Sequence, residues 1–439
     1  MTTLALRWFP RRVLVTLAFG VSTVGCSLLA GVEWDRVSTR ALGAQDGSPG
    51  SSSGSSSDVG GASCAATEVE CLSAAAGVAC CPRNDDPGSP SSIAAGTSNT
   101  CVVTTTGQVR CWGSNSVGQL GRGSDVQLRT TNKPLTVLRI PRGAKSITVG
   151  SAHVCAVVDS LFACWGGNSS GAFGNGGLEG APLPIVVSLP GVPSRLGAGN
   201  ETTCATIAGT GYCWGSNTAQ QAGGGDTVLR LVTPQAVPGL TGADAIMAGA
   251  AHSCASTSSG LRCWGNNTSN RLGAVGATQT GTPVAVTNGG SATQLALGNA
   301  HACAVVGGGL RCWGSNIFGE LGDDAISLQS NGAITPVGLS AGVTSVCAGY
   351  GHTCAVHNGG VKCWGMNDRG QSGTAATARV PTPVTDLASG VKEVACGTFH
   401  TCAVLDSGDA KCWGSNDAGQ LGDGTTDASA RRPRAVIWP

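Results

Sequence analysis

Cysteine is the residue type with the most chemistry to offer in this 439-residue chain, which contains 21 of them. Seven cysteines each open a Cys-Trp-Gly triplet, at Cys111, Cys164, Cys213, Cys263, Cys312, Cys363 and Cys412. Each has a second cysteine nine or ten residues upstream, at Cys101, Cys155, Cys204, Cys254, Cys303, Cys354 and Cys402. Thiols in such pairs could form disulfides, bind a metal or pack as small apolar side chains.

Histidine recurs in the same pattern, two residues before the upstream cysteine, at His153, His252, His301, His352 and His400. A ring of imidazoles could hold a metal. However, a residue needed once for catalysis would not recur in each unit, whereas a structural residue would. We therefore expect these side chains to bond the backbone of a neighbouring unit. His357 lies outside the pattern, and we expect it in the Asn358-Gly359-Gly360 turn.

Other chemical motifs are missing from the sequence. It has no Gly-x-Ser-x-Gly, His-Glu-x-x-His or Cys-x-x-Cys motif. The Asp-rich segments at 322–324 and 422–427 lack a full set of calcium ligands. The formal net charge is +1, with Lys and Arg scattered, which gives no footprint for nucleic acid. We predict no catalytic residues, no cofactor and no metal site, and hence a protein that is not an enzyme.

The spacing of the triplets defines the elements that position these residues. Successive triplets are 49–53 residues apart, a period typical of a propeller blade or a solenoid unit. The unit near residue 400 contains four short strand-like segments, at 381–386, 391–397, 400–404 and 410–414. A content of 69 glycines and only three methionines also favours short strands joined by tight turns.

The paired cysteines fall on the last two of these strands. If Cys303 and Cys312 face each other across a Gly307-Gly308 turn, Ala304 opposes Arg311. Cysteines opposed in this way lie about 4.5–5.5 Å apart at Cα, within disulfide range. We therefore predict seven hairpin disulfides. Cys347 and Cys396, 49 residues apart, either bond each other or pack as small hydrophobes.

The N-terminus predicts export. Arg7, Arg11 and Arg12 precede an apolar run at 13–24 that is too short to span a membrane. We predict a signal peptide over residues 1–25. Thr23-Val24-Gly25-Cys26 resembles the lipobox of bacterial lipoproteins, which makes Cys26 a candidate for lipidation and leaves an even number, 20, of other cysteines. Simple cleavage near Ala30 or Ala44 is the alternative. Arg11-Arg12 also resembles a twin-arginine signal, but export of an unfolded chain suits later disulfide formation better.

Two segments follow the signal peptide. Residues 26–63 are rich in Gly and Ser, and we expect a flexible linker near the membrane. Residues 64–90 form a small segment with Cys64, Cys71, Cys80 and Cys81, for which disulfides are favoured over zinc. We expect the protein in the cell envelope or secreted.

The full repeat pattern points to a family. Gly-x-x-His-Thr-Cys-Ala-Val, then Cys-Trp-Gly-x-Asn and Gly-Gln-Leu-Gly, resembles the regulator of chromosome condensation repeat over residues 91–439. The resemblance implies an all-β, seven-bladed β-propeller of four-stranded blades. The third repeat departs most, with Thr202 in the histidine position and Gln220 to Gly223 in the loop. Because the first copy begins without a Pro-x-x-Val strand, we predict that residues 432–438 complete the first blade and close the ring.

We expect a rigid, monomeric, non-catalytic scaffold that presents its loops to a protein partner and meets the membrane only through the lipid. The segments that differ most between repeats are Arg122 to Lys133, Asn175 to Pro182, Thr227 to Thr233, Val275 to Thr282, Asp323 to Thr335 and Thr374 to Val380. The triplet tryptophans are expected in the core rather than stacked on sugars.

Three alternative functions were weighed. Inhibition of a secreted enzyme, as by a secreted β-lactamase inhibitor with a similar propeller, would need aromatic anchors such as Phe162, Phe173 and Phe318. Glycan binding at one face is a second alternative. Nucleotide exchange on a small GTPase is implied by the family's eukaryotic namesake, but an exported chain has no access to that partner.

Overall fold

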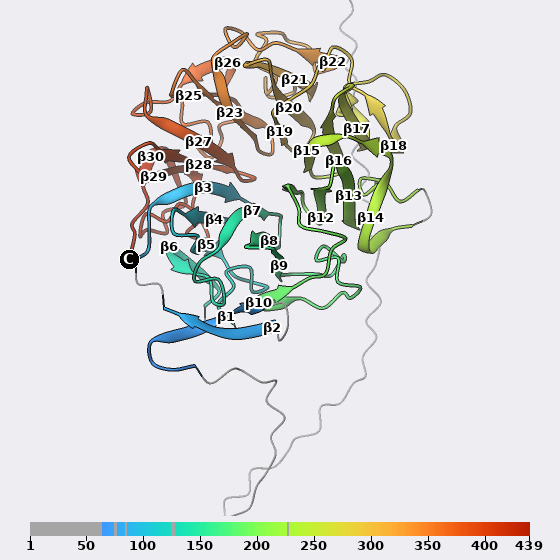
Figure 1. The fold of residues 1–439 in the computed structure, drawn as a ribbon. Coiled ribbons are helices and arrows are strands. Elements are labelled where there is room, and N and C mark those ends of the chain that lie inside the picture. Colours follow the sequence, from blue (N-terminus) through green and yellow to red (C-terminus); the bar gives the residue numbers. More distant parts are fainter. Residues whose placement is uncertain (1–63, 74–76, 84–85, 124–127, 226–227) are drawn as a thin grey trace, which may run out of the picture. The chain divides into compact units, whose positions relative to one another are not determined.

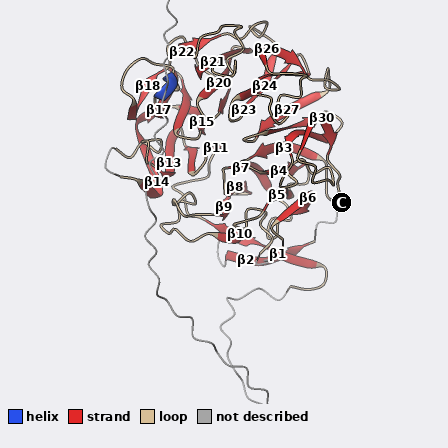
Figure 2. Ribbon diagram, turned by 180° about the vertical axis from the view of Figure 1, so that it is seen from behind, coloured by secondary structure: helices blue, strands red, loops and turns tan. Residues whose placement is uncertain are grey.

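The computed structural model describes residues 64–73, 77–83, 86–123, 128–225 and 228–439. Seven four-stranded antiparallel sheets follow one another along the chain and radiate around a central axis (Figure 1 and, from behind, Figure 2). The described residues contain one helical turn, η1 (Thr268–Asn270), and no helix long and apolar enough to cross a membrane. The predicted all-β, seven-bladed propeller is confirmed.

Each blade takes four consecutive strands, numbered outwards from the axis. Blade 1 contains β3 (Pro90–Ala95), β4 (Asn99–Thr104), β5 (Val109–Ser114) and β6 (Thr130–Thr136). Blade 2 contains β7 (Ala144–Val149), β8 (His153–Val158), β9 (Leu161–Gly166) and β10 (Ala181–Val186). Blade 3 contains β11 (Arg195–Ala198), β12 (Thr202–Ile207), β13 (Thr210–Ser216) and β14 (Arg230–Thr241). Blade 4 contains β15 (Ala243–Ala248), β16 (His252–Thr257), β17 (Gly260–Asn266) and β18 (Gln279–Ala285).

The remaining blades repeat this order. Blade 5 contains β19 (Gln294–Leu297), β20 (His301–Val306), β21 (Gly309–Ser315) and β22 (Gln329–Ile334). Blade 6 contains β23 (Val343–Ala348), β24 (His352–His357), β25 (Gly360–Gly365) and β26 (Ala378–Pro383). Blade 7 contains β27 (Val391–Cys396), β28 (His400–Leu405), β29 (Ala410–Ser415) and β30 (Ser429–Ala435).

A two-stranded hairpin precedes the first blade, formed by β1 (Glu68–Ser73) and β2 (Gly77–Pro82). The structure places Cys64 with Cys80, and Cys71 with Cys81, at disulfide distance. The hairpin contacts the loop after β6, because Arg139 pairs with Glu70 at 3.0 Å and its carbonyl accepts the N–H of Leu72. Residues 1–63 lie outside the described residues, and with them Cys26 and the predicted signal peptide and linker.

The predicted closure of the ring is wrong. The C-terminal strand β30 pairs with β29, as in Cys412 opposite Arg434, and completes the seventh blade rather than the first. The physical reason is that the Pro-x-x-Val strand ends a blade and does not begin one. The Pro-x-x-Val segment is the outermost strand of the blade before it, so the copy that begins at residue 90 already has all four strands.

The paired cysteines occupy the two middle strands of every blade. Cys303 is opposite Cys312 and Ala304 is opposite Arg311, as predicted. In all seven hairpins the two Cα atoms are 4.1 Å apart and the sulfur atoms are at disulfide distance. Cys347 and Cys396 form an eighth such pair in the propeller and join the innermost strands of blades 6 and 7.

The glycine of each Cys-Trp-Gly triplet is required by the backbone. These seven glycines have φ between 88° and 105°, which favours residues without a side chain. A Cβ atom at Gly113, for example, would overlap the carbonyl oxygen of Ser98 in the loop between the first two strands. At this point the third and fourth strands shift register, so the glycine bends the outer strand around the blade.

One carbonyl per blade holds the next blade in place. It belongs to the second residue of the Gly-Gln-Leu-Gly turn or its equivalent, and at six of the seven junctions it accepts the indole N–H of the next blade's triplet tryptophan. At the junction of blades 6 and 7, the carbonyl of Gln371 accepts from Thr401, and the indole N–H of Trp413 is unpaired. At the closing junction, the carbonyl of Gln420 accepts both Trp112 Nε1–H at 2.9 Å and the Thr100 hydroxyl at 3.0 Å. All seven tryptophans are fully buried, as predicted. The ring is thus closed by an ordinary junction between blades.

The recurrent histidines bond a hydroxyl of the next blade and not its backbone, which corrects the prediction. His400 Nε2 is 2.9 Å from Thr100 Oγ1. The Thr100 hydroxyl donates its one proton to the Gln420 carbonyl, so it can only accept a hydrogen bond from His400. Nε2 of His400 is therefore the protonated ring nitrogen. Burial lowers the pKa of His400 to about 4, which keeps the imidazole neutral. His153, His301 and His352 make the same contact to Thr203, Thr353 and Thr401.

Two junctions lack the hydroxyl. His252 faces Ala302, and both of its ring nitrogens are buried without a partner. Asn99, which replaces histidine in blade 1, faces Val154, and its amide is also unpaired. An unpaired buried polar group costs about 1–3 kcal/mol, so these two junctions are weaker than those with a complete contact. The junction of blades 6 and 7 has the Thr401 hydroxyl but leaves the indole N–H of Trp413 unpaired.

We predict that the 20 cysteines after residue 63 are oxidised when the chain is made in an oxidising compartment. The intact mass of the chain from Cys64 onwards, measured before and after alkylation without reductant, should show no gain, because each of these 20 cysteines has a partner. Addition of reductant under denaturing conditions is the control and should reveal 20 thiols. A gain without reductant in the native protein would contradict the pairing.

We predict that Ala302→Thr stabilises the protein by about 1–2 kcal/mol, because the new hydroxyl can accept from His252 and donate to the Arg271 carbonyl. Ala302→Val is the matched control, since valine has the same shape without the hydroxyl. Thermal unfolding should give a higher midpoint for Ala302→Thr than for Ala302→Val. Equal midpoints would show that the hydroxyl has no role at this junction.

Candidate binding face and central channel

The propeller has two chemically different faces. Because the strands of a blade are antiparallel, loops after the first and third strands emerge at one end, which we call the loop face. Turns after the second and fourth strands emerge at the other end, the turn face. The third-to-fourth loops are the long ones, at 115–129, 167–180, 217–229, 267–278, 316–328, 366–377 and 416–428. All six segments predicted to vary between repeats begin in these loops.

Exposed apolar side chains concentrate on the loop face. Thirteen large apolar residues are exposed in the described part of the chain, and nine lie in loops of this face. The nine are Val117, Leu178, Val228, Leu229, Val275, Ile317, Ile326, Leu328 and Tyr350. Leu138, Val192, Val337 and Ile437 lie on the turn face. Ile326 is 87% exposed and Val275 77%, so these side chains contribute nothing to the core.

An aromatic cluster lies on the loop face where blades 5, 6 and 7 meet. The rings of Tyr350 and Phe399 have centroids 5.4 Å apart. Phe318 lies against Gly351, where an added Cβ would overlap its ring, and Ile317 beside it is exposed. Phe318 was predicted from the sequence as a candidate anchor, whereas Tyr350 and Phe399 were not predicted. Their signal is an aromatic residue in a first-to-second loop that is aliphatic or polar in the other blades.

The two other candidate aromatic anchors are unavailable. Phe162 is buried and packs edge-on against Trp214, and Phe173 is fully buried. Both belong to the core shared by blades 2 and 3. For Phe162, the alternation of a β-strand is a signal of burial, because Phe162 lies two residues before Cys164 in β9 and so shares its face of the sheet.

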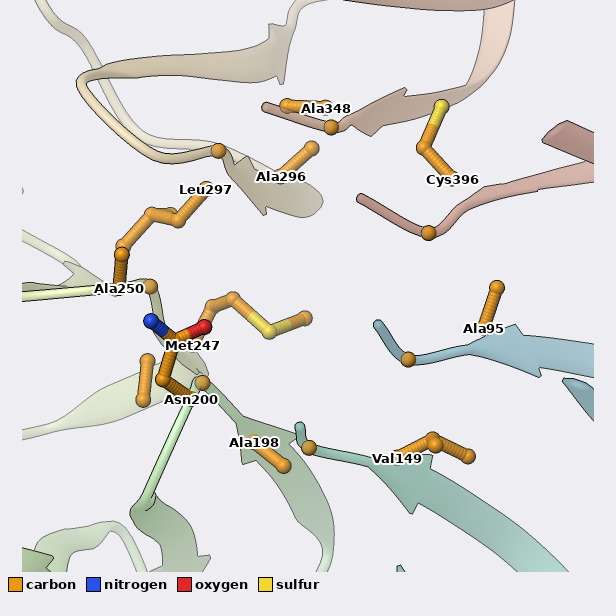
Figure 3. Close-up of a pocket in the computed structure, with 18 of the residues that line it drawn as sticks. Ala95, Val149, Ala198, Asn200, Met247, Ala250, Ala296, Leu297, Ala348 and Cys396 are labelled. Atoms are coloured by element: carbon orange, nitrogen blue, oxygen red, sulfur yellow. The ribbon is translucent and has the colours of Figure 1, made fainter. Parts of the chain in front are cut away.

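The central channel is a cavity of about 730 Å³ lined by the innermost strands of all seven blades. Figure 3 shows their ends converging, with Met247 reaching towards the open centre. Each innermost strand is followed by a glycine, and a side chain there would meet the carbonyl of the next blade's glycine. The glycines are Gly96, Gly150, Gly199, Gly249, Gly298, Gly349 and Gly397. The lining mixes apolar side chains with uncharged polar ones such as Asn200, Gln294 and Asn299, and Glu201 and Glu393 are its only charged residues.

Metal-binding chemistry has little support among the described residues. The side chains close enough to share an ion are those of Cys347, Cys354 and Cys396, whose sulfur atoms lie within 4.8 Å of one another. Cys347 is at disulfide distance from Cys396, and Cys354 from Cys363. In the Asp-rich segment, Asp423 accepts from Arg434 and from Thr425, which satisfies its carboxylate within the turn.

The half-buried carboxylate of Glu393 crosses the closing junction. It accepts the backbone N–H of Ile93 at 3.3 Å, while the neighbouring Lys392 bonds the carbonyl of Ser91. Gln294 makes the equivalent bond to Val346 at 3.1 Å, with a neutral amide. Burial raises the pKa of Glu393 to about 7, and the Ile93 bond and the Lys392 charge oppose this only in part.

We predict that Glu393→Gln raises stability at pH 8 by an amount on the order of 1–3 kcal/mol and changes little at pH 4. A raised carboxyl pKa means that the folded state holds the proton more tightly, so stability falls as pH rises from about 4.5 to 7. Thermal midpoints at both pH values measure the effect. Gln294→Glu is the reciprocal control and should destabilise at pH 8. An equal shift of Glu393→Gln at both pH values would contradict the account.

Comparison with known proteins agrees with this geometry. Models of the regulator of chromosome condensation (RCC1) repeat match residues 91–119, 343–371 and 391–420, and also 106–157 and 358–404. Human WBSCR16 is 21% identical with a TM-score of 0.68, over 76% of this chain and 94% of its own. Prp20p of Saccharomyces cerevisiae, described with its binding properties to Gsp1p and histones, is 22% identical with a TM-score of 0.65, over 76% and 87%. The chain therefore contains RCC1 repeats and folds as a seven-bladed β-propeller.

Proposed function

We propose that this protein is an exported, non-catalytic scaffold that binds a protein partner through the loop face. The observation that carries the proposal is the gathering of nine of the thirteen exposed large apolar residues on that face. Monomers rarely expose such side chains together unless they meet a partner. The rest of the blade is a rigid frame, which is the usual support for recognition loops.

Two further observations support a binding role. The channel carries two carboxylates in a wall of apolar and uncharged polar side chains and offers no set of catalytic groups among the described residues. The structurally similar Prp20p binds other proteins: Gsp1p and histones in one case and Kap60 in another. That likeness concerns the fold, so the identity of the partner has to come from this chain's own surface.

The proposed location rests on the cysteines. Ten pairs at disulfide distance suit a compartment in which thiols are oxidised. Export is therefore part of the proposal, and lipidation of Cys26 stays a prediction. The inhibitor alternative is weakened, since two of its three aromatic anchors are buried.

The test compares two matched triple variants. Val275→Ser, Ile326→Ser and Leu328→Ser remove exposed apolar groups from the loop face, and Leu138→Ser, Val192→Ser and Val337→Ser do so on the turn face. We expect the loop-face variant to recover at least about tenfold less partner from an extract of the cell envelope, while the turn-face variant matches the wild type. Equal recovery by both variants, or loss only with the turn-face variant, would overturn the proposal.

A further inference from the structure

The cysteine pair Cys347–Cys396 differs from the other pairs of the propeller in what it joins. The seven hairpin pairs link neighbouring strands of one blade, and their partners are 9 or 10 positions apart in the sequence. Cys347 and Cys396 are 49 residues apart and link β23 of blade 6 to β27 of blade 7. The pair is therefore a clamp across the junction of blades 6 and 7. The other six junctions have no such cysteine pair among the described residues.

The pair also differs in its access to solvent. All fourteen hairpin cysteines are fully buried. Cys347 is 7% exposed, Cys396 is half-buried, and both line the channel cavity. Figure 3 shows Cys396 at the channel wall with its sulfur turned towards blade 6, the side on which Ala348 lies. Because the cavity holds about 730 Å³, a small thiol can reach this pair without unfolding of a blade.

A second cysteine pair lies directly behind the clamp. Cys354 is opposite Cys347 in the β23–β24 register, and its sulfur is within 4.8 Å of those of Cys347 and Cys396. Since Cys354 is itself paired with Cys363, the set contains two disulfides in contact rather than free metal ligands. Sulfur atoms placed in this way can exchange partners.

We propose that Cys347 and Cys396 form a thiol–disulfide exchange site whose substrate is a dithiol. A thiolate of the dithiol attacks Cys396 Sγ, the Cys347–Cys396 bond breaks, and Cys347 leaves as a thiolate. The second thiol of the reagent then attacks the reagent's other sulfur atom, which is bonded to Cys396 in the mixed disulfide. Cys396 leaves as a thiolate. The dithiol becomes a disulfide, and its two electrons and two protons pass to the cysteines.

The freed Cys347 thiolate can also react with the neighbouring disulfide. Attack on Cys354 forms a Cys347–Cys354 bond and releases Cys363 as the thiol, with no change in the number of disulfides. Partial reduction therefore leaves Cys396 free in both cases, together with either Cys347 or Cys363. This pattern is specific to the register of β23, β24 and β25 and would not arise from general unfolding.

The site lies beneath the aromatic cluster of the loop face. Cys347 and Cys396 each precede one of the paired rings, Tyr350 and Phe399, by three residues. The loops are also linked by the Tyr350 N–H, which donates to the carbonyl of Thr398 at 3.1 Å. Opening the clamp thus removes one of the links that hold the two rings in contact.

The experiment is brief reduction of the native chain with limiting dithiothreitol, followed by alkylation and assignment of the labelled peptides. Among the sixteen propeller cysteines, we expect Cys396, with Cys347 or Cys363, to be labelled at least about tenfold faster than the rest. Even labelling of all hairpins, or slower labelling of Cys396, would overturn the proposal. A parallel arm with reduced thioredoxin distinguishes a protein dithiol from a small one as the source of electrons.

A double variant controls for the assignment. Cys347→Ala with Cys396→Ala copies the alanines that occupy the corresponding places in the junctions on either side, Ala296 with Ala348 and Ala395 with Ala95. It should fold and lose the fast labelling. Fast labelling of Cys354 or Cys363 at an undiminished rate in this variant would contradict entry through the clamp. The wild-type peptide pattern decides the question even if the variant does not fold.

Discussion

The structure depends on one backbone carbonyl in each blade, which accepts the indole N–H of the next blade's tryptophan at six junctions and a hydroxyl of the next blade at five. The group is buried, so its partners have to be supplied by the neighbour, and this fixes how closely two blades approach. Four neutral histidines extend the contact by donating to that hydroxyl. The same bonds form between blade 7 and blade 1, which is why the ring closes without an exchanged strand.

A frame held in this way leaves the loops free to differ. The tight turns and outer strands are anchored by the repeated residues. The remainder of each third-to-fourth loop is held at its backbone by one repeated asparagine, as Asn168 donates to the carbonyls of Gly177 and Glu179, so its side chains can vary. Large apolar side chains collect there, and the two aromatic rings of blades 6 and 7 meet at the mouth of the channel. The cross-blade cysteine pair lies directly below. Recognition and redox chemistry would thus share one sector of one face.

The sequence predicted most of the fold because each blade repeats the same local signals. The facing of Cys303 and Cys312 followed from a two-glycine turn, and the burial of the tryptophans from their place beside a strand cysteine. The strand at which each blade begins could not be predicted, because a circular repeat has no first strand. The C-terminal strand was therefore assigned to the wrong blade. Tyr350 and Phe399 were missed because they become neighbours only when blades 6 and 7 are placed side by side.

The central claim is that the loop face is the binding face, and hydroxyl-radical footprinting tests it without knowledge of the partner. The chain is oxidised in buffer and in cell-envelope extract, and the labelling of exposed side chains is compared. The account predicts protection of Val275, Ile317, Ile326 and Leu328 in the extract, with Val192, Val337 and Ile437 unchanged. Protection confined to the turn face, or equal on both faces, would contradict it.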